Sequence, residues 1–470
     1  MEMYVAGEWQ SSSEASPVIH PYSNATVAEV PVADRSQIEA ALAAAVDGAK
    51  AMRALSPYDR LSLLYRAADQ IDAELDDFAR TISLESGKPL SEARAEARRA
   101  GELIRLSAAE GARIHGETIP VDSAQGNEGK LAFTLRQPCG VIVAITPFNY
   151  PLLLVLHKVA PALASGNAVI LKPAEQTPLT AIKLTELMLR AGLPNLAIQC
   201  ITGPGDIVGR PLCADPRVRM VSFTGSTSVG ERIAQIAGVK KLALELGSNS
   251  AMVVLRDADI ELASSAAATG GYVNAGQVCL SVQRVLVSRD CYADYLDALI
   301  PKVERISVGD PFAEDTQMSS LITTKAAERV LQTVNDAIGA GGTLLTGGTR
   351  NGAVMSPTVV SEVNSHTDIW TEEVFGPAIG VASVEGVGEA ISMINGGKYG
   401  LAAGIFTSSV GDAMQFAKSV DVGNAHINAA PLWRADSMPY GGLKSSGLGK
   451  EGPRWAIEEM TESKTIVIHG

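Results

Sequence analysis

The chain has 470 residues, which is enough for two or more domains with well-buried cores. Apolar residues make up 46% and aromatic residues 5%, with 44 glycines, a composition typical of an α/β enzyme with an aliphatic core and not of a disordered chain. The formal net charge of −13 argues against a broad nucleic-acid-binding surface, because phosphate binding requires clustered lysine and arginine side chains.

The first hundred residues predict successive helices, rich in alanine, arginine, glutamate and leucine. Their expected ranges are 36–54, 57–86 and 90–114. The first nine residues lack the basic start and apolar segment of a signal peptide. We therefore expect the chain to stay in the cytoplasm.

Residues 141–255 alternate between short β-rich runs and helix-length amphipathic segments. The predicted strands are 141–145, 168–171, 197–201 and 218–223, and the predicted helices are 152–165, 178–191 and 205–213. Prolines, His157 and Lys158 interrupt the apolar stretch 141–164, which argues against a membrane span. Strand–helix repetition of this kind predicts a parallel, doubly wound sheet.

A second α/β series follows Glu245. It has predicted strands at 251–255 and 284–287 and predicted helices near 258–272 and 291–306. This series indicates a second domain, which carries Cys279. Residues 130–136 and 463–468 alternate like edge strands, which invite pairing with another subunit.

Two turns at the ends of predicted strands favour nucleotide binding. The turn from Gly225 to Gly230 opens a helix whose free N–H groups attract phosphate oxygens. Lys172 and Glu175 lie just beyond a strand, where ligands of open sheets gather. A plain strand–helix turn and a solvated surface pair are the alternatives for these two features.

Two further residues suggest covalent chemistry. Cys279 can act as a nucleophile, although a lone cysteine is more often a small buried apolar side chain. Glu245 lies in an apolar run, where burial raises the pKa of a carboxylate and suits it to accept a proton; a salt-bridged core carboxylate is the alternative. The five cysteines form no CxxC pair and are odd in number, so we predict no metal site and no disulfide framework.

Taken together, ordered motifs along nearly the whole chain resemble the aldehyde dehydrogenase superfamily. The motifs are PFNYP at 147–151, LKPAEQTP at 171–178, FTGST at 223–227, LELG at 244–247, GQVC at 276–279, EEVFGP at 372–377 and MPYGG at 438–442. Two positions depart from the usual family pattern: Phe148 replaces a tryptophan, and Ser248-Asn249 replace Gly-Lys.

The resemblance implies an aldehyde dehydrogenase-like α/β fold with a Rossmann-like NAD-binding domain, an α/β catalytic domain and a small β arm for oligomerisation. The NAD-binding domain is expected at 1–115 and 136–243, with 426–450 returning to it. Residues 244–425 are expected to form the catalytic domain, and 116–135 and 451–470 the bridging strands. A homodimer or homotetramer is therefore expected.

The resemblance also assigns catalytic roles. Cys279 is expected to attack the aldehyde, with the Asn149 amide and the Cys279 backbone N–H holding the oxyanion. After hydride transfer to the nicotinamide, Glu245 is expected to activate the water that hydrolyses the thioester. Because CoA-acylating relatives typically lack this glutamate, its presence favours a free acid as product.

The cofactor is expected to be NAD, and NADP is less favoured. Glu175 supports this choice, because a carboxylate beside the ribose accepts from the 2′-hydroxyl and repels a 2′-phosphate. The residues expected to contact the cofactor are Thr146, Pro147, Phe148, Lys172, Glu175, Gly205, Phe223, Thr224, Gly225, Ser226, Leu246, Gly247, Glu373 and Phe375.

The substrate is expected to be a small anionic or polar aldehyde. Arg99, His157 and Arg434 match positions around the aldehyde tunnel, and two arginines with a histidine suit a carboxylate, phosphonate, phosphate or sulfonate. Tyr150 and Ser281 are further expected contacts. This set resembles the phosphonoacetaldehyde, sulfolactaldehyde and lactaldehyde branch of the family.

Other interpretations of the same residues remain open. Arg99 can instead pair with Glu96 or Glu102 on its own helix, and Arg434 with Asp436 or the backbone. Neutral aliphatic or aromatic aldehydes are then the alternative substrates. A non-catalytic binding protein of this fold and a thiol esterase are the alternatives from different functional classes.

Overall fold

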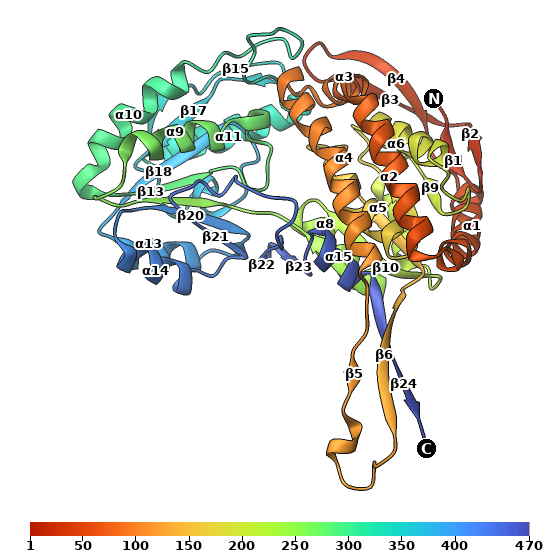
Figure 1. Cartoon of the computed structure of the whole chain (residues 1–470). Helices are drawn as coiled ribbons and strands as arrows, with labels where there is room; N and C mark the ends of the chain where they lie inside the picture. The colour runs from red at the N-terminus through yellow and green to blue at the C-terminus, as the bar shows by residue number, and fades with distance from the viewer. Residues whose placement is uncertain (470) are drawn as a thin grey trace.

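The computed structural model describes residues 1–469, and two large sheets with covering helices dominate it. Figure 1 shows the sheets in separate lobes, with a thin β arm projecting from the lobe that contains the N-terminus. The α/β fold with two sheets and an arm is confirmed. None of the helices within residues 1–469 is both long and apolar enough to cross a bilayer.

The first sheet has eight strands with a parallel centre. In spatial order they are β2 (Glu8–Gln10), β1 (Met3–Val5), β9 (Ile198–Cys200), β8 (Ala168–Lys172), β7 (Val141–Ile145), β10 (Val218–Thr224), β11 (Lys241–Glu245) and β23 (Gly447–Leu448). The strands from β9 to β11 run parallel, and the outer strands pair antiparallel. The four strands β7 to β10 and their parallel arrangement were predicted, whereas β11 was not. Their carboxyl ends therefore meet along one edge, where ligands of such sheets bind.

Helices cover both faces of this sheet. They are α1 (Arg35–Ala54), α2 (Pro57–Ala73), α3 (Leu75–Ser86), α4 (Leu90–Ala112), α5 (Leu153–Ala164), α6 (Leu179–Arg190), α7 (Arg210–Ala214), α8 (Thr227–Ala237) and α15 (Pro453–Glu459). The expected helix 57–86 is two helices, because the backbone at Glu74 leaves helical geometry. The sequence has no glycine or proline at that point, so tertiary packing sets this boundary.

The N-terminal segment contains strands that were not predicted. β1 and β2 extend the first sheet, and β3 (Ala15–His20) pairs with β4 (Ala25–Pro31) as a hairpin. Most of these strands are short, and exposed and buried positions do not alternate strictly along them. The period-two signal that identifies a strand is therefore weak.

The second sheet has seven strands. In spatial order they are β14 (Thr343–Thr346), β17 (Thr358–Ser361), β18 (Ala378–Val384), β13 (Arg284–Ser288), β12 (Ala251–Val254), β20 (Ala402–Phe406) and β21 (Asn424–Ile427). Its main helices are α9 (Ile260–Gly270), α10 (Tyr292–Glu304), α11 (Thr324–Gly339), α13 (Val387–Asn395) and α14 (Val410–Ser419). All of these strands except β14 pair in parallel. Cys279 lies in the loop between α9 and β13.

The arm consists of β5 (Thr118–Ile119), β6 (Leu131–Pro138) and β24 (Thr461–Ile468). β6 is the central strand, so one edge of β24 remains unpaired within residues 1–469 (Figure 1). The two predicted edge strands thus pair with each other. The expected bridging segment 451–470 differs in its first part, where α15 packs against α4 and α5.

Candidate active site

The nucleophile loop has an unusual backbone. Asn274, Ala275 and Gly276 all have positive φ angles, of 51°, 53° and 70°. A Cβ atom at Gly276 would lie 2.1 Å from the Gly376 carbonyl oxygen, so only glycine fits there. These turns carry the chain to Cys279, whose thiol lies 2.7 Å from the Tyr440 hydroxyl.

The thiol is in an environment that opposes its ionisation. Burial raises the pKa of Cys279 to about 12, while the Tyr440 hydrogen bond and the charge of Arg434 act in the opposite direction. The guanidinium carbon of Arg434 lies 3.8 Å from the centre of the Tyr440 ring. The thiol therefore requires a proton acceptor, and Tyr440 is a donor that the thiolate can use.

Asn149 reaches the same loop from the other sheet. Its Nδ2 donates to the Gln277 carbonyl oxygen at 2.9 Å, and its buried Oδ1 has no partner within residues 1–469. An amide nitrogen has two hydrogens, so one remains for an oxyanion. Asn149 and Cys279 line one cavity, which places both predicted oxyanion donors at the same site.

Glu245 ends β11 and is buried. Burial raises its pKa well above the usual range, the nearby charge of Glu451 raises it further, and Lys158 and Arg434 act in the opposite direction. Its Oε2 has no hydrogen-bond partner in the described chain. A carboxylate in this state can take a proton from water.

A charged cluster that was not predicted lies beside Glu245. Glu451 Oε1 accepts from Lys158 Nζ at 3.1 Å, and Glu451 Oε2 accepts from Arg434 at 3.2 Å. Burial opposes the ionisation of Glu451, but the charges of Lys158, His157 and Arg434 outweigh it and hold its pKa below the usual value. Lys158 was visible as a charge inside an apolar helix, whereas no local pattern indicated Glu451.

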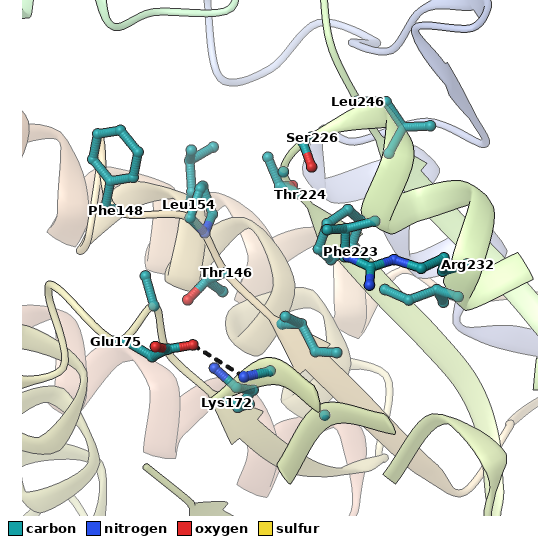
Figure 2. A pocket seen from close by; sticks show the side chains of 18 of the residues that line it. Thr146, Phe148, Leu154, Lys172, Glu175, Phe223, Thr224, Ser226, Arg232 and Leu246 are labelled. Carbon is teal, nitrogen blue, oxygen red and sulfur yellow. Dashed lines mark hydrogen bonds between the residues drawn. The ribbon is translucent and has the colours of Figure 1, made fainter. Parts of the chain in front are cut away.

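A cavity of about 920 Å³ extends from Cys279 along the carboxyl edge of the first sheet. It is lined by all of the predicted cofactor residues except Gly247, whose N–H donates to Thr227. Lys172 and Glu175 lie on one side of this pocket and Thr224 and Ser226 on the other (Figure 2). The pocket therefore has the length and the glycine-rich edge that a dinucleotide requires.

The side chains of the pocket are held by local bonds. Glu175 accepts from the Gly205 N–H at 3.0 Å (Figure 2), and the buried Lys172 donates to the Pro173 carbonyl at 2.9 Å. Ser226 precedes the first turn of α8 without capping it, which leaves the N–H groups of that turn open to a phosphate. Thr146 Oγ1 is also buried without a partner within residues 1–469.

The part of the pocket that is expected to hold the nicotinamide is aromatic and acidic. The rings of Phe148 and Phe375 meet edge to face, with 5.8 Å between their centres. Glu373 Oε1 accepts from the Ser248 N–H at 2.9 Å, and burial raises the pKa of Glu373 to about 7. These residues fit a nicotinamide riboside, with a planar ring beside Phe375 and ribose hydroxyls beside Glu373.

The unusual Ser248-Asn249 pair supports the same loop. Asn249 Nδ2 donates to the carbonyls of Trp370 and Glu372, at 2.8 and 2.9 Å. Asn249 thus fixes the backbone just before Glu373, and the Ser248 N–H holds the Glu373 side chain. The departure from the family pattern thus places an amide where it holds the Glu373 loop.

Three arginines also line the cavity and were not predicted: Arg210, Arg232 and Arg329. Arg329 donates to the Val374 carbonyl at 2.8 Å, next to Glu373. Arg232 lies on α8 near Phe223 (Figure 2). None of the three belongs to a recognised motif, so only the folded arrangement brings them to the pocket.

The predicted substrate residues Arg99, His157 and Arg434 form one cluster around Asp436. Asp436 accepts two bonds from Arg99, at 2.6 and 3.1 Å, and lies 3.3 Å from His157 Nε2. His157 Nδ1 lies 3.4 Å from Arg434. The three residues thus converge, but a carboxylate of the chain itself neutralises Arg99.

Arg434 is the cation of this cluster that lies nearest the nucleophile. Its Nε is buried without a partner in the described residues, and its side chain covers the Tyr440 ring. The alternatives considered for these arginines were wrong in detail: Arg99 pairs with Asp436, and Arg434 with Glu451. Arg99 and Asp436 are 337 residues apart and Arg434 and Glu451 are 17 apart, so helical spacing could not reveal either ion pair.

Of the two further expected substrate contacts, Tyr150 lies near Cys279, whereas Ser281 lies behind the nucleophile loop. The Tyr150 ring lies 3.7 Å from Lys88 Nζ and packs near Cys279, while its hydroxyl has a pKa raised by burial. Ser281 is buried, and its hydroxyl donates to the Gly270 carbonyl at 3.1 Å. Ser281 therefore supports the nucleophile loop from behind.

No group of three or more His, Cys, Asp or Glu side chains between residues 1 and 469 is arranged to hold a metal ion.

Comparison with known proteins identifies the family of the chain. The sequence profile described as "Aldehyde dehydrogenase family" matches residues 9–466. A 3-sulfolactaldehyde dehydrogenase of Priestia aryabhattai is 45% identical over 467 residues, covering 99% of this chain and 98% of the relative. A lactaldehyde dehydrogenase of Methanococcus vannielii is 38% identical over 475 residues, covering 99% and 100%.

A solved structure shares the whole architecture. The glyceraldehyde-3-phosphate dehydrogenase GapN of Methanocaldococcus jannaschii, in complex with NADP, superimposes with a TM-score of 0.93 at 36% identity, covering 97% of this chain and 99% of its own. These likenesses match the branch that the sequence motifs indicated. The chain belongs to the aldehyde dehydrogenase family, and it is an oxidoreductase that uses a nicotinamide cofactor.

Proposed function

We propose that this enzyme oxidises a small anionic aldehyde to its carboxylic acid with NAD, through a covalent intermediate on Cys279. The observation that carries the proposal is the single cavity of about 920 Å³ that reaches from Cys279 and Asn149 to Lys172 and Glu175. Such a cavity lets one nucleophile face a bound aldehyde and the reactive end of a dinucleotide together.

The first step is attack on the aldehyde. The Cys279 thiolate forms a bond to the carbonyl carbon, and the carbonyl oxygen becomes an oxyanion that accepts from Asn149 Nδ2 and the Cys279 N–H. Loss of one such donor typically costs about 3–4 kcal/mol of transition-state stabilisation. The Tyr440 hydroxyl, 2.7 Å from the thiol, stabilises the thiolate before attack.

The second step converts the tetrahedral adduct to a thioester. A bound nicotinamide supplies the hydride acceptor for this step. Glu373 and Phe375 fix the position of that ring from the ribose side and the ring side. When the oxyanion collapses to a carbonyl, Asn149 keeps its bond to the oxygen and holds the thioester in place.

The third step releases the acid. Glu245 takes a proton from a water molecule, which attacks the thioester carbon and expels the Cys279 thiolate. The pKa of Glu245, raised by burial and by Glu451, makes this carboxylate a stronger base than a solvated one. Hydrolysis regenerates the nucleophile and yields a free carboxylate product.

Arg434 supports the anionic substrate. Its buried guanidinium covers Tyr440 beside the nucleophile, so an anionic group on a short aldehyde lies within its field. Because Asp436 already neutralises Arg99, the positive charge that remains suits a substrate with one small anionic group and not one with several. The Priestia relative, named for 3-sulfolactaldehyde, agrees with an anion of this kind.

Glu175 supports NAD as the cofactor. Its carboxylate lines the pocket and is fixed there by the Gly205 N–H at 3.0 Å. A fixed negative charge there accepts from a ribose 2′-hydroxyl and repels a 2′-phosphate. Arg210 lines the same pocket and favours a phosphate, so the preference for NAD is expected to be finite.

The arm supports a homo-oligomer. One edge of β24 is unpaired in the described residues, and the arm exposes Leu131 and Leu135 on β6 and Ile468 on β24. An unpaired strand edge beside exposed apolar side chains invites pairing with a second copy. Sedimentation of the full chain and of a variant with charged residues at 131 and 135 distinguishes an oligomer from a monomer.

Steady-state kinetics with a panel of aldehydes test the substrate class. 3-Sulfolactaldehyde and lactaldehyde form a matched pair, which differ by one sulfonate, and phosphonoacetaldehyde, succinic semialdehyde and benzaldehyde extend it. We expect the highest kcat/KM for a small anionic aldehyde. A preference for benzaldehyde or a long alkanal would favour the neutral-aldehyde alternative and contradict the proposal.

A further inference from the structure

Two carboxylates on α4 contact the two loops that carry the oxyanion donors. Glu92 and Glu96 are separated by one helical turn, so they project from the same face of the helix. We propose that they are positioning residues, which align the Asn149 amide with the Cys279 N–H. This inference rests on the proposed roles of Asn149 and Cys279.

Glu92 holds the nucleophile loop. Both of its carboxylate oxygens accept from the Asn274 N–H, at 2.9 and 3.2 Å. Asn274 begins the run of positive φ angles that leads to Cys279. Its side chain in turn donates to the Asn149 carbonyl oxygen at 3.2 Å. Glu92 therefore fixes the residue that joins the two loops.

Glu96 holds the loop of Asn149. Its Oε1 accepts from the N–H groups of Leu152 and Leu153, at 2.9 and 3.1 Å, where the Asn149 loop enters α5. A carboxylate at this position also interacts favourably with the helix dipole. Its Oε2 pairs with Lys88 Nζ at 2.6 Å, and both side chains are fully buried.

The contacts form a closed circuit around the oxyanion position. The Asn149 amide donates to the Gln277 carbonyl at 2.9 Å, two residues before the nucleophile. Both loops are thus bonded to each other and to one rigid helix of the first lobe. Because a misplacement of about 1 Å can cost about 100-fold in rate, this anchoring matters for catalysis as well as for stability.

Lys88 completes the arrangement. It neutralises Glu96 and lies over the Tyr150 ring, between Asn149 and α5. Neither Glu92 nor Glu96 lines the 920 Å³ cavity, so neither is expected to contact the cofactor bound there. Any effect of Glu92 and Glu96 on the reaction therefore has to act through the loops of Asn149 and Cys279. Such an effect changes the rate of the reaction without changing cofactor binding, so the two can be measured separately.

The test compares Glu92→Ala with Glu92→Gln, with Glu102→Ala on an exposed position of the same helix as the control. The rate constant of the NADH burst per active site is measured at saturating NAD and aldehyde, along with both KM values. We expect Glu92→Ala to lower the burst rate about 10- to 100-fold with KM values within about twofold. Glu92→Gln keeps an oxygen acceptor and is expected to restore most of the rate.

A second variant keeps the test decisive if Glu92→Ala does not fold. Asn274→Gly tolerates the positive φ angle but removes the amide that reaches Asn149, and we expect the same loss of burst rate. Wild-type burst rates per active site in the folded variants would overturn the positioning role, even if their thermal stability fell. Aldehyde oxidation by Cys279→Ser at the wild-type rate would instead overturn the proposed function.

Discussion

The thiol of Cys279 lies 2.7 Å from the hydroxyl of Tyr440, whose ring is covered by the Arg434 guanidinium at 3.8 Å. A hydrogen bond to a charged group contributes about 1.5–3 kcal/mol, so Tyr440→Phe is expected to destabilise the thiolate. We expect the rate of Cys279 alkylation by iodoacetamide at a fixed pH below its pKa to fall about 10-fold or more. Equal alkylation rates of the folded variant and wild type would show that the hydroxyl does not stabilise the thiolate.

Asp436 sets the charge of the substrate cluster. Asp436→Asn removes the carboxylate that neutralises Arg99, so kcat/KM for 3-sulfolactaldehyde is expected to rise several-fold relative to lactaldehyde. Arg434→Gln is expected to lower the same ratio. Asp76→Asn, in an exposed ion pair with Arg94, is the matched control. If the variants changed kcat/KM equally for both aldehydes, this cluster would not recognise the anionic group of the substrate.

Glu175 is predicted to discriminate between the two dinucleotides. Glu175→Gln keeps an oxygen that can accept from the Gly205 N–H but removes the negative charge at the ribose end of the pocket. We expect the ratio of kcat/KM for NADP to that for NAD to rise about 10-fold, which corresponds to about 1.4 kcal/mol. Arg210→Gln is expected to lower this ratio. An unchanged ratio in both variants would contradict the assignment of this end of the pocket.

Glu451 is predicted to control the pH dependence of turnover. Its negative charge raises the pKa of Glu245, so Glu451→Gln is expected to lower that pKa and move the acid limb of the kcat profile to lower pH. The variant also leaves Lys158 without its buried partner, which is expected to cost about 3–5 kcal/mol in the free energy of unfolding. If the acid limb of the folded variant stayed at the wild-type pH, Glu451 would not control the pKa of Glu245.

The parallel centre of the first sheet and two strands of the second, β12 and β13, could be predicted because these strands are apolar, buried on both faces and flanked by long helices. The break at Glu74 and the N-terminal strands could not, because packing against neighbouring elements determines them. Their local sequence contains neither a breaker nor a clear period.

The same distinction applies to the site. Cys279, Asn149 and Glu245 lie in ordered motifs and were named from the sequence, and the structure brings the first two to one cavity. Tyr440 also lies in an ordered motif, MPYGG, but its contact with Cys279, which is distant in sequence, could not be predicted. Glu451, Asp436 and Glu92 likewise act through contacts between distant segments. Their roles depend on three-dimensional proximity, for which a single sequence carries no local signal.

The central claim is that aldehyde oxidation passes through a thioester on Cys279 that Glu245 releases. Rapid mixing of Glu245→Gln with NAD and aldehyde, followed by acid quench and peptide mass analysis, tests it most directly. We predict about one NADH per active site, an acyl group on the Cys279 peptide, and steady turnover lowered about 100-fold or more. Normal turnover by this variant, or a burst of NADH without an acyl group on Cys279, would contradict the claim.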